Sequence, residues 1–234
     1  MKITLGTTYY ENPEYLEKFV EAHLPHCDEL IVVDDGSQKF KAFTVLHEDP
    51  KIKLYRVKKD YGFNSHGCRN LIMKEASNDW VVLIDVDRQF GEGGNHLAKI
   101  RNKQLDESTL YKFVVHVNRL GINVHQSIND YIVNKKMFFS AGGYDEELRG
   151  VREGDRDFMF QMLHYGPQKT LSDINLMHIR PPSGTLKEEL DKAKHNGVPF
   201  GLPYTQQLKD LVESRKIKPD PNKPILTFDW ERVF

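Results

Sequence analysis

The chain has 234 residues, 39% of them hydrophobic and 29% charged, with a formal net charge of −1. This is the composition of an ordinary globular protein, and its near-zero charge gives no bulk field that would attract nucleic acid or an anionic membrane. No run approaches the roughly 20 apolar residues of a membrane span, and the start of the chain lacks the apolar stretch of a signal peptide. Two cysteines are too few for a disulfide framework. We therefore expect a cytoplasmic protein with reduced thiols.

The first ninety residues alternate between predicted strands and predicted helices. Buried-strand patterns cover residues 3–7, 30–33, 52–57 and 80–84, and helical patterns cover residues 13–24, 40–47 and 65–76. Asn12 and Pro13 suit the cap and first position of the first helix, which Pro25 ends. Such alternation predicts an α/β protein with a parallel or mostly parallel sheet that helices cover on both faces.

The second half of the chain has a less regular pattern. Helices are predicted over residues 96–103 and 155–165, and strands over residues 111–117 and 131–134, with a polar stretch between those strands. Further helical patterns at residues 187–194 and 206–215 precede a proline-rich linker (218–224) and a tail (225–230). The tail is apolar enough to dock on the body of the protein or on a partner.

Two carboxylates follow the most apolar of the predicted strands. Residues 81–84 are branched apolar residues, and Asp85 and Asp87 come directly after them. In open α/β sheets ligands lie outside the carboxyl ends of the strands, and two neighbouring acids repel each other unless a cation is near. The pair therefore predicts Mn²⁺ or Mg²⁺ holding a phosphorylated ligand, because these ions bind few protein carboxylates together with phosphate oxygens and water. A solvated acidic turn is the alternative.

Polar side chains also follow two other predicted strands. Thr7, Thr8 and Tyr9 end the first strand, and Asp34 and Asp35 end the second. Hydroxyl, aromatic and carboxylate groups together suit a nucleotide, since a carboxylate accepts the N–H of a pyrimidine and a tyrosine ring stacks on a base. Taken alone, the two acids favour a tight turn in which aspartate bonds the local backbone.

Six short segments of the chain form a recognisable series. Residues 31–37 read Ile-Val-Val-Asp-Asp-Gly-Ser, and Gly-Phe-Asn at 62–64 is followed by Cys-Arg-Asn at 68–70. Asp-Val-Asp stands at 85–87, and Ser-Ala-Gly-Gly-Tyr-Asp-Glu at 140–146 precedes Glu-Gly-Asp-Arg-Asp-Phe at 153–158. Their order and spacing resemble family 2 glycosyltransferases with the GT-A fold. The resemblance covers roughly residues 3–180, and it implies a mostly parallel, Rossmann-like sheet between helices, with a helical C-terminal extension.

The resemblance also implies a role for individual residues. It implies nucleotide-sugar contacts from Thr7, Thr8, Tyr9, Asp34, Asp35, Arg69, Asp85 and Arg180, and a metal site of Asp85, Asp87 and His178. Asp155 is the expected base that deprotonates the acceptor hydroxyl, with Asp157 as the fallback. The chain departs from the family at Gly154, where the motif has Glu, and this leaves the base open. Arg69 as a helix-surface residue and His178 as a structural or solvated residue are the alternatives.

By resemblance, the chain is a metal-dependent, inverting hexosyl- or pentosyltransferase. It would move a sugar from a nucleotide-diphosphate donor, UDP-sugar being favoured, to the hydroxyl of a glycan or another compound. A hydroxylated nucleobase in DNA ranks low as an acceptor. A sugar-nucleotidyltransferase is an alternative, but residues 6–11 lack the glycine- and basic-rich loop such enzymes carry. A non-catalytic nucleotide-sugar-binding module is a second alternative, and Gly154 is its support.

The resemblance further predicts how the chain is divided. Residues 1–180 would form the catalytic domain, with a nucleotide-sugar-binding half (1–90) and an acceptor and catalytic half (91–180). Residues 181–234 would form a lid and the helical extension with its linker and tail. No oligomeric state is implied.

Overall fold

The computed structural model describes residues 1–91, 94–116, 124–149, 154–179, 210, 213–214 and 220–234. The strands are β1 (Ile3–Tyr9), β2 (Glu29–Asp34), β3 (Ile52–Val57), β4 (Trp80–Leu83), β5 (Arg88–Phe90), β6 (Leu110–His116), β7 (Val124–Asn134), β8 (Gln168–His178) and β9 (Trp230–Arg232). The helices are α1 (Pro13–His23), α2 (Ser65–Glu75), α3 (Asn95–Arg101), α4 (Lys135–Ser140) and α5 (Gly154–Leu163), with short 3₁₀ turns η1 (Ala42–Thr44) and η3 (Glu146–Leu148).

The described strands form one nine-stranded sheet in the order β5-β8-β6-β7-β4-β1-β2-β3-β9. Strands β1 to β4 are mutually parallel. Both β4 and β6 are antiparallel to β7, and β8 is parallel to β6, so β6 and β8 run in the same direction as β1 to β4. The predicted mostly parallel sheet is confirmed. Its carboxyl edge collects the ends of β1, β2, β4 and β8.

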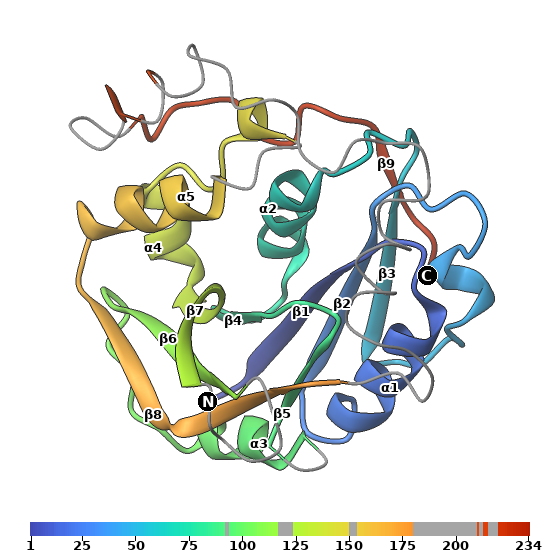
Figure 1. Cartoon of the computed structure of the whole chain (residues 1–234), viewed down its shortest axis with the longest axis horizontal. Coiled ribbons are helices and arrows are strands. Elements are labelled where there is room, and N and C mark those ends of the chain that lie inside the picture. The colour runs from blue at the N-terminus through green and yellow to red at the C-terminus, as the bar shows by residue number, and fades with distance from the viewer. Residues whose placement is uncertain (92–93, 117–123, 150–153, 180–209, 211–212, 215–219) are drawn as a thin grey trace.

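Helices cover the sheet on both faces (Figure 1), with α1 and α3 on one side and α2, α4 and α5 on the other. Successive side chains of β2 point to opposite faces of the sheet, which explains why this strand is apolar throughout. Leu30 and Val32 pack into the core with α1, whereas Ile31 and Val33 pack into the core with α2. Helix α2 lies close to β1, because a Cβ at Gly6 would stand 2.2 Å from Cγ2 of Ile72.

The predicted helix over residues 40–47 is wrong, because only the 3₁₀ turn η1 forms there. Side chains satisfy the backbone of this segment in place of helical hydrogen bonds. The Glu11 carboxylate accepts the N–H groups of residues 38–40, and Oδ2 of Asp34 accepts the Ala42 N–H at 2.8 Å. The hydroxyl of Tyr9 donates to the Phe40 carbonyl.

Two strands of the second half differ from expectation. The strand predicted at residues 131–134 begins at Val124, and β8 was not predicted at all. Polar residues interrupt the pattern of β8 (Gln-Lys-Thr-Leu-Ser-Asp-Ile-Asn-Leu-Met-His), yet it lies between β6 and β5 and pairs with both. Its pairing, not its composition, makes it a strand.

The C-terminal tail docks on the body of the protein. Residues Trp230–Arg232 pair antiparallel with β3, and the Phe228 ring is buried against the α2 side of the sheet. The Glu146 carboxylate accepts the N–H groups of Leu226 and Thr227 at 2.7 and 2.9 Å. The prediction that the tail docks is confirmed, and the body is what it docks on.

The remaining expectations for the C-terminal part concern residues that the structure describes only in part. The predicted helix at 187–194 lies outside the described residues, as does most of 206–215, where residues 210, 213 and 214 are helical. A lid and helical extension over residues 181–234 and a domain boundary at 180 stay predictions. Cys27 and Cys68 are buried free thiols. In the described part of the chain, no helix has both the length and the hydropathy to span a membrane.

Candidate active site

Segments far apart in the sequence meet at the carboxyl edge of the sheet. In register, Tyr9 of β1 stands beside Asp34 of β2, and Asp85 is the second residue after the end of β4. The chain then turns back into β5, which pairs with β8 so that Arg88 faces His178. The Ile179 N–H donates to the Asp87 carbonyl at 2.7 Å. This pairing brings the predicted metal ligands Asp87 and His178 together.

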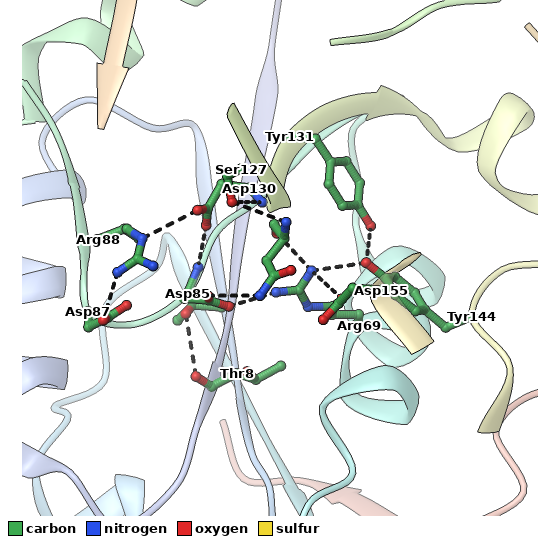
Figure 2. Close-up of polar contacts among 12 residues, drawn as sticks. Thr8, Arg69, Asp85, Asp87, Arg88, Ser127, Asp130, Tyr131, Tyr144 and Asp155 are labelled. Carbon is green, nitrogen blue, oxygen red and sulfur yellow. Dashed lines mark hydrogen bonds and ion pairs between the residues drawn. The ribbon is translucent and has the colours of Figure 1, made fainter. Parts of the chain in front are cut away.

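A buried arginine joins the Asp-x-Asp segment to helix α5 (Figure 2). Arg69 of α2 is only 3% exposed, and its Nη2 donates to Oδ1 of Asp85 at 2.7 Å. Its Nη1 donates to the Asn129 carbonyl at 2.7 Å and to the Tyr144 hydroxyl at 3.0 Å, and lies 3.6 Å from Oδ1 of Asp155. The alternative interpretation of Arg69 as a residue on the helix surface is therefore wrong. Arg69 holds Asp85 and Asp155 in one cluster.

Burial changes the pKa values of the two acids in this cluster. Burial raises the pKa of Asp85, and the nearby Arg69 charge opposes the shift without cancelling it. The pKa of Asp155 is raised for the same reason, again against the influence of Arg69. A carboxylate whose pKa is raised accepts a proton more readily, which suits a general base.

Asp87, Arg88 and His178 form a second cluster beside the first. Nη1 of Arg88 lies 2.7 Å from Oδ2 of Asp87 and 2.6 Å from Nδ1 of His178, and these two acceptor atoms are 3.2 Å apart. Burial by itself would raise the pKa of Asp87, but the adjacent positive charge of Arg88 opposes it, and that pKa is held below its usual value. His178 is thus in contact with Arg88 and Asp87, and its role as a metal ligand stays a prediction.

Asp130 supports both clusters, and sequence reasoning missed it. Its Oδ1 accepts the Asp85 N–H at 2.9 Å, and its Oδ2 lies 3.3 Å from Nε of Arg88. It is fully buried, and burial raises its pKa to about 6. In the sequence it ends the polar stretch between two predicted strands. The available signal was its position just before an apolar strand, because an antiparallel strand starts where its parallel neighbours end.

The side chains expected to contact the nucleoside divide into two groups. Tyr9 and Asp34 are 1% exposed and are engaged by the loop that follows β2, since both oxygens of Asp34 accept backbone N–H groups, from Ser37 and Ala42. Asp34 therefore agrees with the alternative of a tight turn in which aspartate bonds the local backbone. Thr7 is buried as well, whereas Thr8 is half-buried and points toward Asp85 (Figure 2).

Asp35 is a buried acid at this edge of the sheet, and its pKa is raised far above the usual value of an aspartate. Its Oδ2 accepts the Asn64 N–H at 2.7 Å, yet burial raises its pKa to about 7. Between pH 4 and 7 the folded protein keeps a proton that the unfolded chain has released. This contribution therefore lowers the free energy of unfolding as pH rises, by up to about 1.4 kcal/mol per pH unit. We expect Asp35→Asn to be less pH-sensitive than the parent in urea unfolding between pH 4 and 7. Parallel curves for the two proteins would contradict this.

Helix α5 directs its two acids to different partners. Asp155 faces Arg69, whereas the Asp157 carboxylate accepts a hydrogen bond from Nε2 of Gln161. Oε1 of Gln161 in turn accepts from Nζ of Lys223 at 2.7 Å. Asp157, the fallback for the base, is thus tied to the C-terminal segment, whereas Asp155 lies in the Arg69 cluster.

Packing explains why glycine stands at position 154. A Cβ at Gly154 would lie 2.2 Å from Cε1 of the buried His66 ring, so a glutamate would not fit without moving that ring. The departure from the family motif thus reflects the contact between α5 and His66. Arg180, the other expected diphosphate contact, lies outside the described residues.

The second cluster fits a divalent ion through few protein ligands. Within the described ranges, no group of three or more His, Cys, Asp or Glu side chains is assembled to hold a metal. However, Oδ2 of Asp87 and Nδ1 of His178 are 3.2 Å apart. Two neighbouring ligands of an octahedral ion at 2.0–2.1 Å are separated by about 3 Å. The pair therefore matches two adjacent positions of such a site, and phosphate oxygens and water are the usual remaining ligands of Mg²⁺.

The fold and this polar edge define the protein as a GT-A-type α/β protein. The sequence profile described as glycosyl transferase family 2 matches residues 5–138, more than half of the chain. The chain therefore belongs to glycosyltransferase family 2. No curated protein sequence is significantly similar to it.

Solved structures of glycosyltransferases share this fold. The mannosyltransferase PcManGT from Pyrobaculum calidifontis, in complex with GDP-Man and Mn²⁺, aligns with a TM-score of 0.59 and 16% identity over 92% of this chain and 69% of its own. GalNAc-T7 with UDP, GalNAc and Mn²⁺ aligns with a TM-score of 0.56 and 13% identity over 93% of this chain. TarS of S. aureus aligns with a TM-score of 0.55 and 16% identity. The chain spans only 54% of GalNAc-T7 and 43% of TarS.

Proposed function

We propose that the protein transfers a glycosyl residue from a nucleoside-diphosphate sugar, UDP-sugar being the expected donor, to an acceptor hydroxyl in a metal-dependent reaction that inverts the anomeric configuration. The acceptor expected is a glycan or another hydroxyl compound. The observation that carries the proposal is the convergence of Asp85, Asp87, His178 and Asp155 at one sheet edge from three separate segments.

In the proposed site the two clusters have separate roles. Asp87 and His178 would hold Mn²⁺ or Mg²⁺, and Asp85 would bind either the ribose or the same ion. When bound, the ion would neutralise the negative charge that develops on the departing diphosphate. The neighbours with GDP-Man and with UDP are compatible with a donor of either base, and UDP is kept as the expected donor on the resemblance of the sequence motifs.

Asp155 would act on the acceptor. The acceptor oxygen forms a bond to the anomeric carbon, the bond from that carbon to the diphosphate oxygen breaks, and the electron pair leaves with the diphosphate. The acceptor proton passes to the Asp155 carboxylate, whose raised pKa suits this transfer. Inversion follows because no carboxylate nucleophile takes part.

The proposal is tested by calorimetric titration of UDP and GDP into the protein with and without Mn²⁺. We expect UDP to bind in the presence of Mn²⁺, and Asp87→Ala to weaken this binding at least tenfold, about 1.4 kcal/mol, because a metal ligand is lost. Asp173→Asn is the matched control, since Asp173 lies on β8 as His178 does but pairs at the surface with Lys103.

A second readout addresses catalysis. UDP release from a UDP-sugar, with an added glycan or with water as acceptor, should depend on Mn²⁺ and be lost in Asp87→Ala. Metal-independent UDP binding that is unchanged in Asp87→Ala would refute the metal site. Pyrophosphate release from a nucleoside triphosphate and a sugar phosphate would indicate a nucleotidyltransferase instead.

A further inference from the structure

Arg88 directly follows the Asp-x-Asp segment and has no role in the proposed reaction. Its side chain is 12% exposed and is held from two sides. Nε lies 3.3 Å from Oδ2 of the buried Asp130, and Nη1 lies 2.7 Å from Oδ2 of Asp87 and 2.6 Å from Nδ1 of His178. One nitrogen of a permanent cation thus lies between the two atoms that would bind the metal.

The hydrogen-bonding chemistry of these groups fixes their roles. A guanidinium group only donates hydrogen bonds, so Nδ1 of His178 must accept with its lone pair. Oδ2 of Asp87 accepts from the same Nη1. Both acceptor atoms therefore direct lone pairs at one point, which is the arrangement that coordination of a metal ion requires. Arg88 keeps the two ligands 3.2 Å apart and oriented before any ion binds.

The same arrangement makes the two cations mutually exclusive. An ion bound to Oδ2 of Asp87 and Nδ1 of His178 at about 2.1 Å would occupy the space of Nη1 and repel the guanidinium charge. A metal can load only when Arg88 leaves, and departure breaks its ion pairs with Asp87 and, if the whole side chain moves, with buried Asp130. The ion has to offset these losses.

We propose that Arg88 is an internal cation that occupies the metal position in the free protein, so that Mn²⁺ or Mg²⁺ binds strongly only together with a nucleoside diphosphate. This inference rests on the proposed function, because the diphosphate brings both additional oxygen ligands for the ion and negative charge for the displaced Arg88. The permanent positive charge of Arg88 thus couples the binding of the metal ion to the binding of the nucleotide donor.

The test measures Mn²⁺ binding by electron paramagnetic resonance, without and with UDP, in the parent protein, Arg88→Gln and a control. Without UDP, we expect Arg88→Gln to bind Mn²⁺ at least tenfold more tightly than the parent, because glutamine does not bring a competing charge. UDP should tighten Mn²⁺ binding less in the variant than in the parent. Arg101→Gln, which removes an arginine that pairs with Asp28 near the protein surface, should match the parent in both respects.

Equal or weaker Mn²⁺ binding by a folded Arg88→Gln in the absence of UDP would overturn the inference. If thermal unfolding shows that this variant does not fold, nuclear magnetic resonance of arginine-labelled parent protein decides the question. The Arg88 guanidinium signal should shift when Mg²⁺ and UDP are added together, and an unshifted signal at saturation would also overturn it. Failure of the proposed function is distinguishable, since the parent would then show no coupling between Mn²⁺ and UDP while Arg88→Gln could still bind Mn²⁺ more tightly.

Discussion

Asp155→Asn is expected to lower the rate of glycosyl transfer by about 10²–10⁴-fold while UDP binds with Mn²⁺ as in the parent protein. Removal of a general base costs this much because the acceptor hydroxyl then keeps its proton in the transition state. The substitution keeps the size of the side chain and its place 3.6 Å from Nη1 of Arg69. Initial rates of UDP release and calorimetric titration of UDP measure the two quantities separately.

Asp157→Asn is the matched control for this prediction. Asp157 lies on the same helix and accepts a hydrogen bond from Gln161, which is in turn bonded to Lys223, so its replacement should affect the rate far less. A larger loss of rate in Asp157→Asn than in Asp155→Asn would contradict the assignment and make Asp157 the base. Loss of UDP binding in Asp155→Asn would indicate that Asp155 holds the donor site together instead.

Arg69→Met is expected to lower the free energy of unfolding by about 3–5 kcal/mol. Arg69 is buried and neutralises Asp85 and Asp155, so its loss leaves the buried Asp155 and the half-buried Asp85 without their cation. Urea unfolding followed by circular dichroism measures the effect. Part of the loss should return in Arg69→Met/Asp85→Asn, because the second substitution removes one of the unpaired charges.

Arg101→Met provides the comparison for Arg69→Met. Arg101 also pairs with a carboxylate, that of Asp28 at 2.6 Å, but its side chain is 37% exposed. Water compensates the loss of such a pair, so we expect a change of about 1 kcal/mol or less. Similar losses in the two variants would show that burial of Arg69 does not decide its contribution.

Much of the fold could be predicted because its signals are local. Runs such as residues 30–33 and 81–84 are apolar on both sides of the strand, which requires helices on both faces of a sheet. Parallel strands end at one edge, so the positions of Asp85 and Asp87 relative to that edge followed from the pattern as well. The family was recognisable from the order of short motifs, and the profile match to residues 5–138 confirms it.

Within the site, the sequence indicated residue types but not their partners. Asp34 and Asp35 are neighbours with similar surroundings in the sequence, yet the first bonds the loop backbone at Ser37 and Ala42 and the second accepts from Asn64. The sequence also left open which acid of α5 faces Arg69. The orientation of a helix on its sheet decides this, and no local pattern encodes it.

The sequence by itself determined the α/β class, the family and the candidate acids, because strand periodicity and motif order are properties of neighbouring residues. Only the tertiary structure decided that β8 is a strand, that its end brings His178 to Asp87, and that Asp130 and Arg88 lie beneath and between the expected ligands. These features depend on contacts between residues 42 to 91 positions apart. Such contacts form only when the sheet assembles, since the free energy of burying and pairing these charges depends on the complete edge.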